Sequence, residues 1–306
     1  MMVTTRTRRL ALACLCLSLA VSTASGQKAS RDSDFIRFRE TGEQEGVLET
    51  AIARFTNKDG VTVDLVAAVH IADRKYYEDL NKRFKNYEVV LYEMIKPKKA
   101  DPASRGRGGA ITFLQRTMKN VLDLHFQLDG VDYTAKNFVH ADMDPGTFAR
   151  EQELNDESLF KLLFRSVLKQ WKRQMTSKQE SMSFGSLLSA LLSDDSSRAL
   201  KYLFARELKN AEEMLAGLGG EKGTVIVEGR NKVAMKVLHE QIEAGKKKVA
   251  IFYGGGHMPD LEKRLVKELA MKKTGQEWLP AWDIHAKKPA KAGKKAGKSR
   301  RALREL

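Results

Sequence analysis

Two histidines, His70 and His257, lie in the same local setting although they are far apart in the chain. Each ends an apolar run with the composition of a β-strand, and each is followed by a stretch with helical periodicity. Open α/β sheets bind their ligands just beyond the carboxyl ends of the strands, where the next helices begin. Glu93 lies near the end of a third apolar run, 88–95. Two imidazoles and a carboxylate at strand ends predict a metal site or an acid–base site.

His257 carries the stronger signal of the two histidines. Gly254, Gly255 and Gly256 come directly before it, and glycine allows unusual backbone dihedrals and a close approach of substrate to the main chain. Pro259 suits the first turn of a helix, whose free N–H groups attract anions. The alternative interpretation is a tight turn that needs glycines and carries a histidine without a role.

Arg230 and Asn231 follow a short apolar run, 224–228, which we interpret as another strand. At the carboxyl end of that strand they would hold a substrate carboxylate or stabilise an oxyanion; the alternative is a helix start with a solvated arginine. Glu93 also has two interpretations, because a buried carboxylate costs free energy unless it is paired. It either forms a structural ion pair, or it ligates a metal or acts as general base on a bound water.

The first third of the chain predicts the strands that position these residues. We expect one or two strands within 35–55, a turn at 57–60, where the sequence is Asn-Lys-Asp-Gly, and a partner strand over 61–69 that completes a hairpin. Apolar residues then recur at helical spacing, which predicts a helix capped by Asp73. The nearly continuous apolar run at 88–95 is typical of a strand covered by helices on both faces of the sheet.

The block 145–219 has helical periodicity and nothing that resembles a strand, so we expect an all-helical cap inserted in an α/β domain. His140 and Asp142, just ahead of this block, are further candidates to line the cleft. After it, the β-α-β pattern resumes, with strands expected at 224–228, 248–253 and 277–284 and helices at 231–244 and from 259. The expected fold class is α/β, with a mostly parallel or mixed sheet flanked by helices.

The first 26 residues have the features of an export signal. A start with three arginines precedes an apolar stretch, 10–21, that is too short to span a bilayer, and small residues follow. We therefore expect an exported protein, periplasmic or secreted. Both cysteines, Cys14 and Cys16, lie in this segment, so a metal site in the mature protein would use nitrogen and oxygen ligands.

The formal net charge of +15 is concentrated near the end of the chain, where 287–306 holds nine Lys or Arg and one Glu. We expect 286–306 to be a basic disordered tail and 34–285 to be the folded domain. The tail would bind an anionic envelope surface, or it is a solubilising segment without a dedicated partner. We expect no specific nucleic-acid partner.

Four segments taken together resemble the TraB/PrgY/GumN/TIKI superfamily, namely Ala-Ala-Val-His-Ile-Ala at 67–72, Leu-Tyr-Glu-Met at 91–94, Glu-Gly-Arg-Asn at 228–231 and Tyr-Gly-Gly-Gly-His-Met-Pro at 253–259. Members carry two G-x-x-H motifs, a strand-ending glutamate and an Arg-Asn/Asp element before the second motif. Two positions depart from this pattern, because Ala67 replaces a glycine and Gly229 replaces an acidic residue.

The resemblance implies an erythromycin-esterase/ChaN-like α/β fold and, as in the Tiki branch, metal-dependent peptidase activity. By position, the metal ligands would be His70, His257 and Glu93, with Arg230 and Asn231 in supporting roles. The ion would be zinc, manganese or cobalt, since nitrogen and oxygen ligands suit all three. The substrate would be a peptide or a small ester.

Three functions stay open at this point. The first is an exported hydrolase in which metal-activated water cleaves an amide or ester bond; its metal-free variant would use a histidine as general base. The second is a non-catalytic protein that sequesters a peptide signal or a haem-like ligand in the same cleft. The third is an envelope-anchoring protein that acts through its basic tail.

Overall fold

A computed structural model of the chain describes residues 35–97, 121–155, 184–218 and 224–285. The expected export signal, 1–26, and the expected basic tail, 286–306, lie outside the described residues. Of the helices within the described ranges, none combines the length and the apolar character that crossing a membrane requires.

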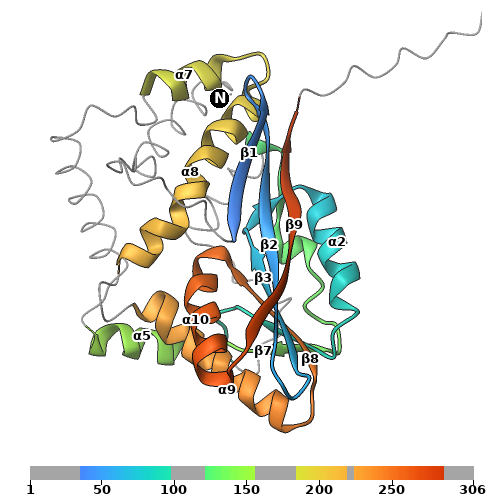
Figure 1. Cartoon of the computed structure of the whole chain (residues 1–306). Coiled ribbons are helices and arrows are strands. Elements are labelled where there is room, and N and C mark those ends of the chain that lie inside the picture. The colour runs from blue at the N-terminus through green and yellow to red at the C-terminus, as the bar shows by residue number, and fades with distance from the viewer. Residues whose placement is uncertain (1–34, 98–120, 156–183, 219–223, 286–306) are drawn as a thin grey trace, which may run out of the picture.

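A seven-stranded mixed sheet runs through the molecule in the order β1-β2-β3-β8-β5-β7, with β9 also paired to β2 (Figure 1). Strands β3, β8, β5 and β7 are parallel neighbours, whereas β1, β3 and β9 are antiparallel to β2. The α/β class with a mixed sheet is therefore confirmed. The strand bounds are β1 (Ile36–Gly42), β2 (Glu45–Thr56), β3 (Thr62–Ala68), β5 (Val89–Tyr92), β7 (Phe138–His140), β8 (Lys248–Gly254) and β9 (Lys272–Ile284).

The predicted hairpin is present and joins β2 to β3. The Asn57 side-chain oxygen accepts hydrogen bonds from the backbone N–H groups of Asp59 and Val61, each at 3.0 Å. Gly60 has a φ of 77°, a left-handed conformation that costs other residues a steric penalty. This turn sets the register of β3 and therefore the place where the chain reaches His70.

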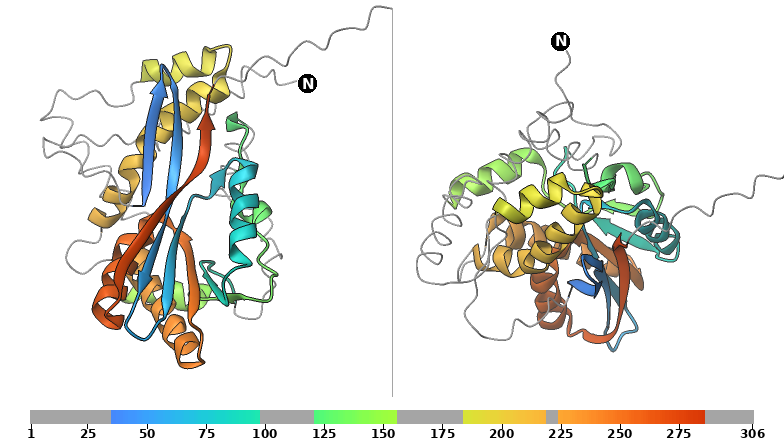
Figure 2. Two further views of the ribbon diagram at one scale, coloured as in Figure 1. Left: turned by 45° about the vertical axis from the view of Figure 1, so that its right-hand side comes forward. Right: turned by 90° about the horizontal axis from the view of Figure 1, so that it is seen from above.

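Helices cover both faces of the sheet, as the two views of Figure 2 show. Helix α2 (Arg74–Phe84) packs on one face, and α9 (Arg230–Glu243) and α10 (Met258–Leu269) pack on the other. Side chains alternate between the two faces along each strand. Val66, Ala68, Tyr92 and Phe252 share a core with α2, whereas Leu65, Ala67, Leu91 and Tyr253 share a core with α9 and α10.

The described parts of 145–219 form helices α5 (Pro145–Leu154), α7 (Phe184–Leu192) and α8 (Ser196–Leu218), and they contain no strand. Residues 156–183 of this block lie outside the described part of the chain. Helix α8 contacts β1, β2 and β9, and it also contacts the short 3-10 helix η3 (Gly255–His257) that carries the second histidine.

The prediction of a strand at 224–228 is wrong. This segment is a π-helical turn, η2 (Val225–Gly229), which leads directly into α9. The Thr224 hydroxyl accepts from the Val227 N–H at 3.1 Å, and the Glu228 carboxylate accepts from the Thr224 N–H. These bonds satisfy donors that a helix start leaves free. A three-residue apolar run alone does not distinguish a strand from a buried helical turn.

Asp73 begins α2 as predicted, but its side chain forms no capping hydrogen bond. Its carboxylate accepts instead from the Asp283 N–H of β9 at 2.7 Å and from the Lys201 ammonium of α8 at 3.2 Å. Asp73 therefore ties three elements together at one end of α2.

Replacing Gly60 with alanine should lower the free energy of unfolding by roughly 1 kcal/mol, because an alanine is strained at positive φ. Gly275→Ala in β9 is the matched control, since a Cβ at either position meets no atom within 4 Å and Gly275 is not among the positive-φ glycines. Urea unfolding of the two variants measures the difference. Equal effects would contradict the role given to the turn.

Candidate active site at the carboxyl ends of the parallel strands

Three neighbouring parallel strands end at one edge of the sheet. Ala68 of β3 lies opposite Gly254 of β8, and Tyr92 of β5 lies opposite Phe252 of β8. His70, Glu93 and His257 follow these strand ends by one to three residues. The prediction that both histidine segments and Glu93 reach the same edge is thus confirmed for the backbone.

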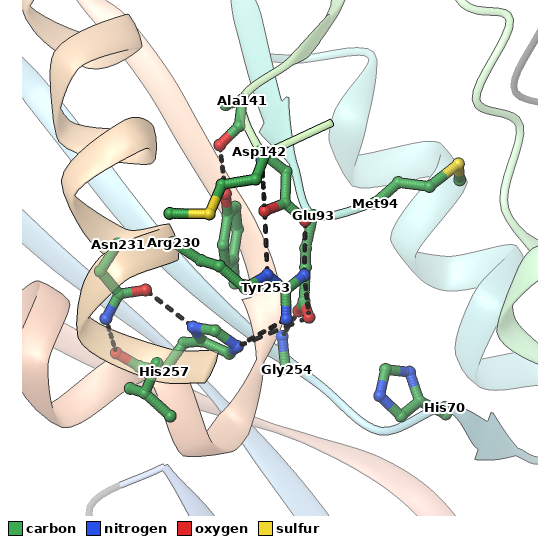
Figure 3. Close-up of polar contacts among 12 residues, drawn as sticks. His70, Glu93, Met94, Ala141, Asp142, Arg230, Asn231, Tyr253, Gly254 and His257 are labelled. Atoms are coloured by element: carbon green, nitrogen blue, oxygen red, sulfur yellow. Dashed lines mark hydrogen bonds and ion pairs between the residues drawn. The ribbon is translucent and has the colours of Figure 1, made fainter. Parts of the chain in front are cut away.

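Glu93, Arg230, Asp142 and His257 form a buried cluster at this edge (Figure 3). Arg230 donates Nε to Asp142 Oδ1 at 2.9 Å and Nη2 to the other oxygen of the same carboxylate. The same Nη2 lies 2.8 Å from Glu93 Oε1. His257 Nε2 lies 3.5 Å from both Glu93 Oε1 and Arg230 Nη1.

The cluster is largely withdrawn from solvent. The Arg230 and His257 side chains are each 8% exposed, Glu93 is 12% exposed and Asp142 is fully buried. Arg230 is therefore not a solvated residue at a helix start, and Glu93 does form an ion pair. Two carboxylates share one guanidinium, so the three charged groups leave one negative charge that favours a further cation or an imidazolium.

The charges of the cluster determine how its members ionise. Burial opposes ionisation of Glu93, but the nearby His257, Arg230 and His70 outweigh it and hold its pKa well below the ordinary value. Burial also disfavours the charged form of Arg230; its hydrogen bonds to Asp142 and the two carboxylate charges nevertheless raise its pKa. Burial and the same carboxylates raise the pKa of Tyr253. At neutral pH Glu93 is therefore ionised, Arg230 is charged and Tyr253 is a neutral phenol.

Asn231 orients the ring of His257. Its amide nitrogen donates to the His257 carbonyl at 3.0 Å and to Asp260 Oδ2 at 2.9 Å, and its amide oxygen lies 2.7 Å from His257 Nδ1. An amide oxygen can only accept, so His257 carries a proton on Nδ1. Its Nε2 therefore faces Glu93 and Arg230 as the atom that gains or loses a proton.

Gly254 allows the sheet edge to approach Glu93. Its N–H donates to Glu93 Oε2 at 2.7 Å, and a Cβ added at this position would lie 3.3 Å from the same oxygen. A side chain at this position would therefore force the Glu93 carboxylate to move by a few tenths of an ångström. The approach of a substrate to the glycine run stays a prediction.

His70 stands apart from the buried cluster (Figure 3). His70 is exposed, and its Nδ1 lies 3.0 Å from Gln127 Oε1. Among the described residues, no group of three His, Cys, Asp or Glu side chains is arranged to hold a metal ion. The three-ligand metal site stays a prediction, and the structure brings two of its members, Glu93 and His257, together.

Asp142 and His140 have different roles although they are neighbours in sequence. Asp142 belongs to the cluster, whereas His140 Nε2 contacts the Met94 carbonyl at 2.6 Å. Gln127, the partner of His70, was not anticipated, since no local pattern links it to a histidine 57 residues away.

The chain matches no protein-family model, no curated protein and no solved structure.

Removing the charge of Glu93 should change how stability depends on pH. Its lowered pKa means that ionised Glu93 stabilises the folded state above the ordinary value of 4.5, and that this contribution is lost as the pH falls through the folded-state pKa. Urea unfolding at a series of pH values below 7 should therefore show a steeper acid loss for the wild type than for Glu93→Gln. Exposed Glu78→Gln is the control; identical slopes for all three proteins would refute the assignment.

Arg230→Met should destabilise the fold by about 3 kcal/mol or more, because it leaves two buried carboxylates without a counter-charge. Arg264→Met is the control: Arg264 pairs with Asp260 and Glu268 but is 19% exposed and lies on α10. That change should cost about 1 kcal/mol or less. Chemical denaturation measures both, and comparable losses would show that Arg230 is not the centre of the buried network.

Proposed function

We propose that this chain is an exported hydrolase of the TraB/GumN type that cleaves a peptide or small ester bond with an activated water. The observation that supports this best is the cluster of Glu93, Arg230, Asp142 and His257. A buried histidine with an unprotonated ring nitrogen, a carboxylate of lowered pKa and a fixed guanidinium are groups that hydrolytic sites use. Exposed His70 at the same strand-end edge would meet the substrate.

His257 would accept the proton of the attacking water at Nε2. Asn231 holds the opposite side of the ring through Nδ1, so Nε2 is the atom left for this task. Glu93 lies 3.5 Å from Nε2 and would stabilise the imidazolium once it forms. Arg230 is held by both oxygens of Asp142, and its remaining N–H groups would stabilise a developing oxyanion.

A divalent ion fits part of this donor set. Ligands of a tetrahedral ion with bonds of about 2.0–2.1 Å lie roughly 3.3 Å apart, close to the 3.5 Å between His257 Nε2 and Glu93 Oε1. These two atoms would hold zinc, manganese or cobalt, with His70 as the third ligand. When bound, the ion would supply a water of lowered pKa. The surplus negative charge of the cluster favours such a cation.

A metal-free hydrolase is the second candidate, and the position of Arg230 favours it. Its guanidinium lies 2.8 Å from Glu93 Oε1 and 3.5 Å from His257 Nε2, so a positive charge already stands beside both donor atoms. In this variant His257 is the general base and Arg230 supplies the electrostatic stabilisation alone.

The fold type, the helical cap, the export signal and the basic tail that the sequence indicates are part of the same proposal. We propose an erythromycin-esterase/ChaN-like arrangement in which the helices of 145–219 form a cap, and the contact between α8 and η3 supports it. Export through 1–26 and binding of an anionic envelope surface through 286–306 are also proposed from the sequence.

Elemental analysis of the mature protein, purified without a histidine tag, combined with cleavage assays on peptide and ester libraries tests the proposal. We expect bound zinc, manganese or cobalt and chelator-sensitive turnover. His70→Ala and His257→Ala should each lower turnover by about a hundredfold or more. His239→Ala is the matched control, since His239 lies on α9 with its side chain 42% exposed.

The other outcomes separate the remaining functions. Turnover that persists with chelator and without metal would leave the metal-free hydrolase. Wild-type cleavage by a folded His70→Ala or His257→Ala variant would exclude that histidine from catalysis. Binding of a peptide or a haem-like ligand without any turnover would replace the hydrolase with a sequestering protein.

A further inference from the structure

We infer that Gln127 is a positioning residue for His70. It holds the imidazole with the proton on Nδ1 and leaves Nε2 unprotonated, the same tautomer that Asn231 imposes on His257. The contribution of His70 Nε2 to metal or substrate binding rests on the proposed function. The assignment of Gln127 to the ring does not depend on it.

Gln127 contacts His70 at two points. Its backbone N–H donates to the His70 carbonyl at 2.8 Å, and its amide Oε1 lies 3.0 Å from His70 Nδ1. The amide nitrogen donates to the Tyr133 hydroxyl at 2.9 Å, which directs Oε1 towards the histidine. Since an amide oxygen accepts and cannot donate, Nδ1 must carry the proton.

The second histidine has a similar set of partners from α9, although here the side-chain amide, and not a backbone N–H, bonds the histidine carbonyl. Asn231 donates to the His257 carbonyl and accepts from His257 Nδ1, and Asp260 orients its amide as Tyr133 orients that of Gln127. Each histidine at this sheet edge thus has one amide residue that binds both its carbonyl and its Nδ1. The recurrence of this arrangement is the observation that carries the inference.

Local packing explains how Gln127 reaches His70. Strand β4 (Ile71–Ala72) follows the histidine and pairs with β6 (His125–Phe126), and Gln127 begins the short helix α4 (Gln127–Gly130) directly after β6. Gln127 is 6% exposed, so its amide would cost free energy without these partners. An exposed histidine is thereby anchored to a buried amide.

We therefore expect that the His70 ring needs no reorganisation before it binds a metal or a substrate. Partners of this kind fix the tautomer and orientation of ligating histidines, and their loss typically costs about tenfold to a hundredfold in metal affinity or activity. Gln127 touches neither substrate nor metal in this arrangement. Its effect passes through His70.

Nitrogen-15 NMR of the histidine-labelled full chain tests the tautomer directly. In spectra recorded at a pH high enough that the histidine signals no longer change, we expect both His70 and His257 to be protonated on Nδ1. Signals are assigned by their loss in His70→Asn and His257→Asn. In Gln127→Met, which lacks the acceptor, His70 should gain the Nε2-protonated form while His257, the internal control, is unchanged. Gln127→Glu restores an acceptor and should restore the wild-type pattern.

Zn²⁺ affinity, measured by competition with a chromophoric chelator, is the second readout. Gln127→Met should bind Zn²⁺ about tenfold to a hundredfold more weakly than the wild type, and Gln127→Glu should not. A wild type that binds no Zn²⁺ would remove the metal from the proposed function, and the NMR result would still decide the role of Gln127. An Nε2-protonated His70 in the wild type would overturn the inference, even if Gln127→Met fails to fold. An unchanged tautomer in a folded Gln127→Met variant would overturn it as well.

Discussion

The buried guanidinium of Arg230 is the interaction on which the rest of the site depends. A charge removed from water is tolerated only when counter-charges and hydrogen bonds surround it, and Arg230 finds them in Asp142 and Glu93. These carboxylates follow β7 and β5, whereas Arg230 begins α9. One side chain therefore links the start of a helix to the ends of two strands, and His257 lies beside both Arg230 and Glu93 (Figure 3).

A second constraint divides the site into two halves. Side chains alternate between the faces of the sheet, so an offset of one residue moves a group to the other side. Glu93 pairs with Arg230 at the start of α9, whereas His70 contacts Gln127 of α4, a helix that packs against α2. The two histidine segments end on adjacent strands, but their rings have different neighbours.

The sequence predicts where the site lies better than it predicts the contacts within the site. Strand ends followed by helix starts correctly indicate that His70, Glu93 and His257 share one edge, because parallel strands have a common direction. The sequence does not show which face of the sheet each of these side chains lies on, because strands covered on both faces are apolar at every position. The pairs Arg230–Asp142 and His70–Gln127 join residues 88 and 57 positions apart, and no local pattern encodes such separations. The error at 224–228 has the same origin, because three apolar residues fit a buried helical turn as well as a strand.

The two histidines therefore are not equivalent, despite their similar sequence settings. His257 is buried in an ionic network, where a proton on Nε2 changes the balance of charge beside Glu93 and Arg230. His70 is exposed, and the side chains that hold it, the Gln127 amide and through it the Tyr133 phenol, carry no charge at neutral pH. In a low-dielectric setting charges interact strongly, whereas an exposed ring is screened by water. The buried half is suited to holding and moving a proton, and the exposed half is suited to meeting a ligand that arrives from solvent.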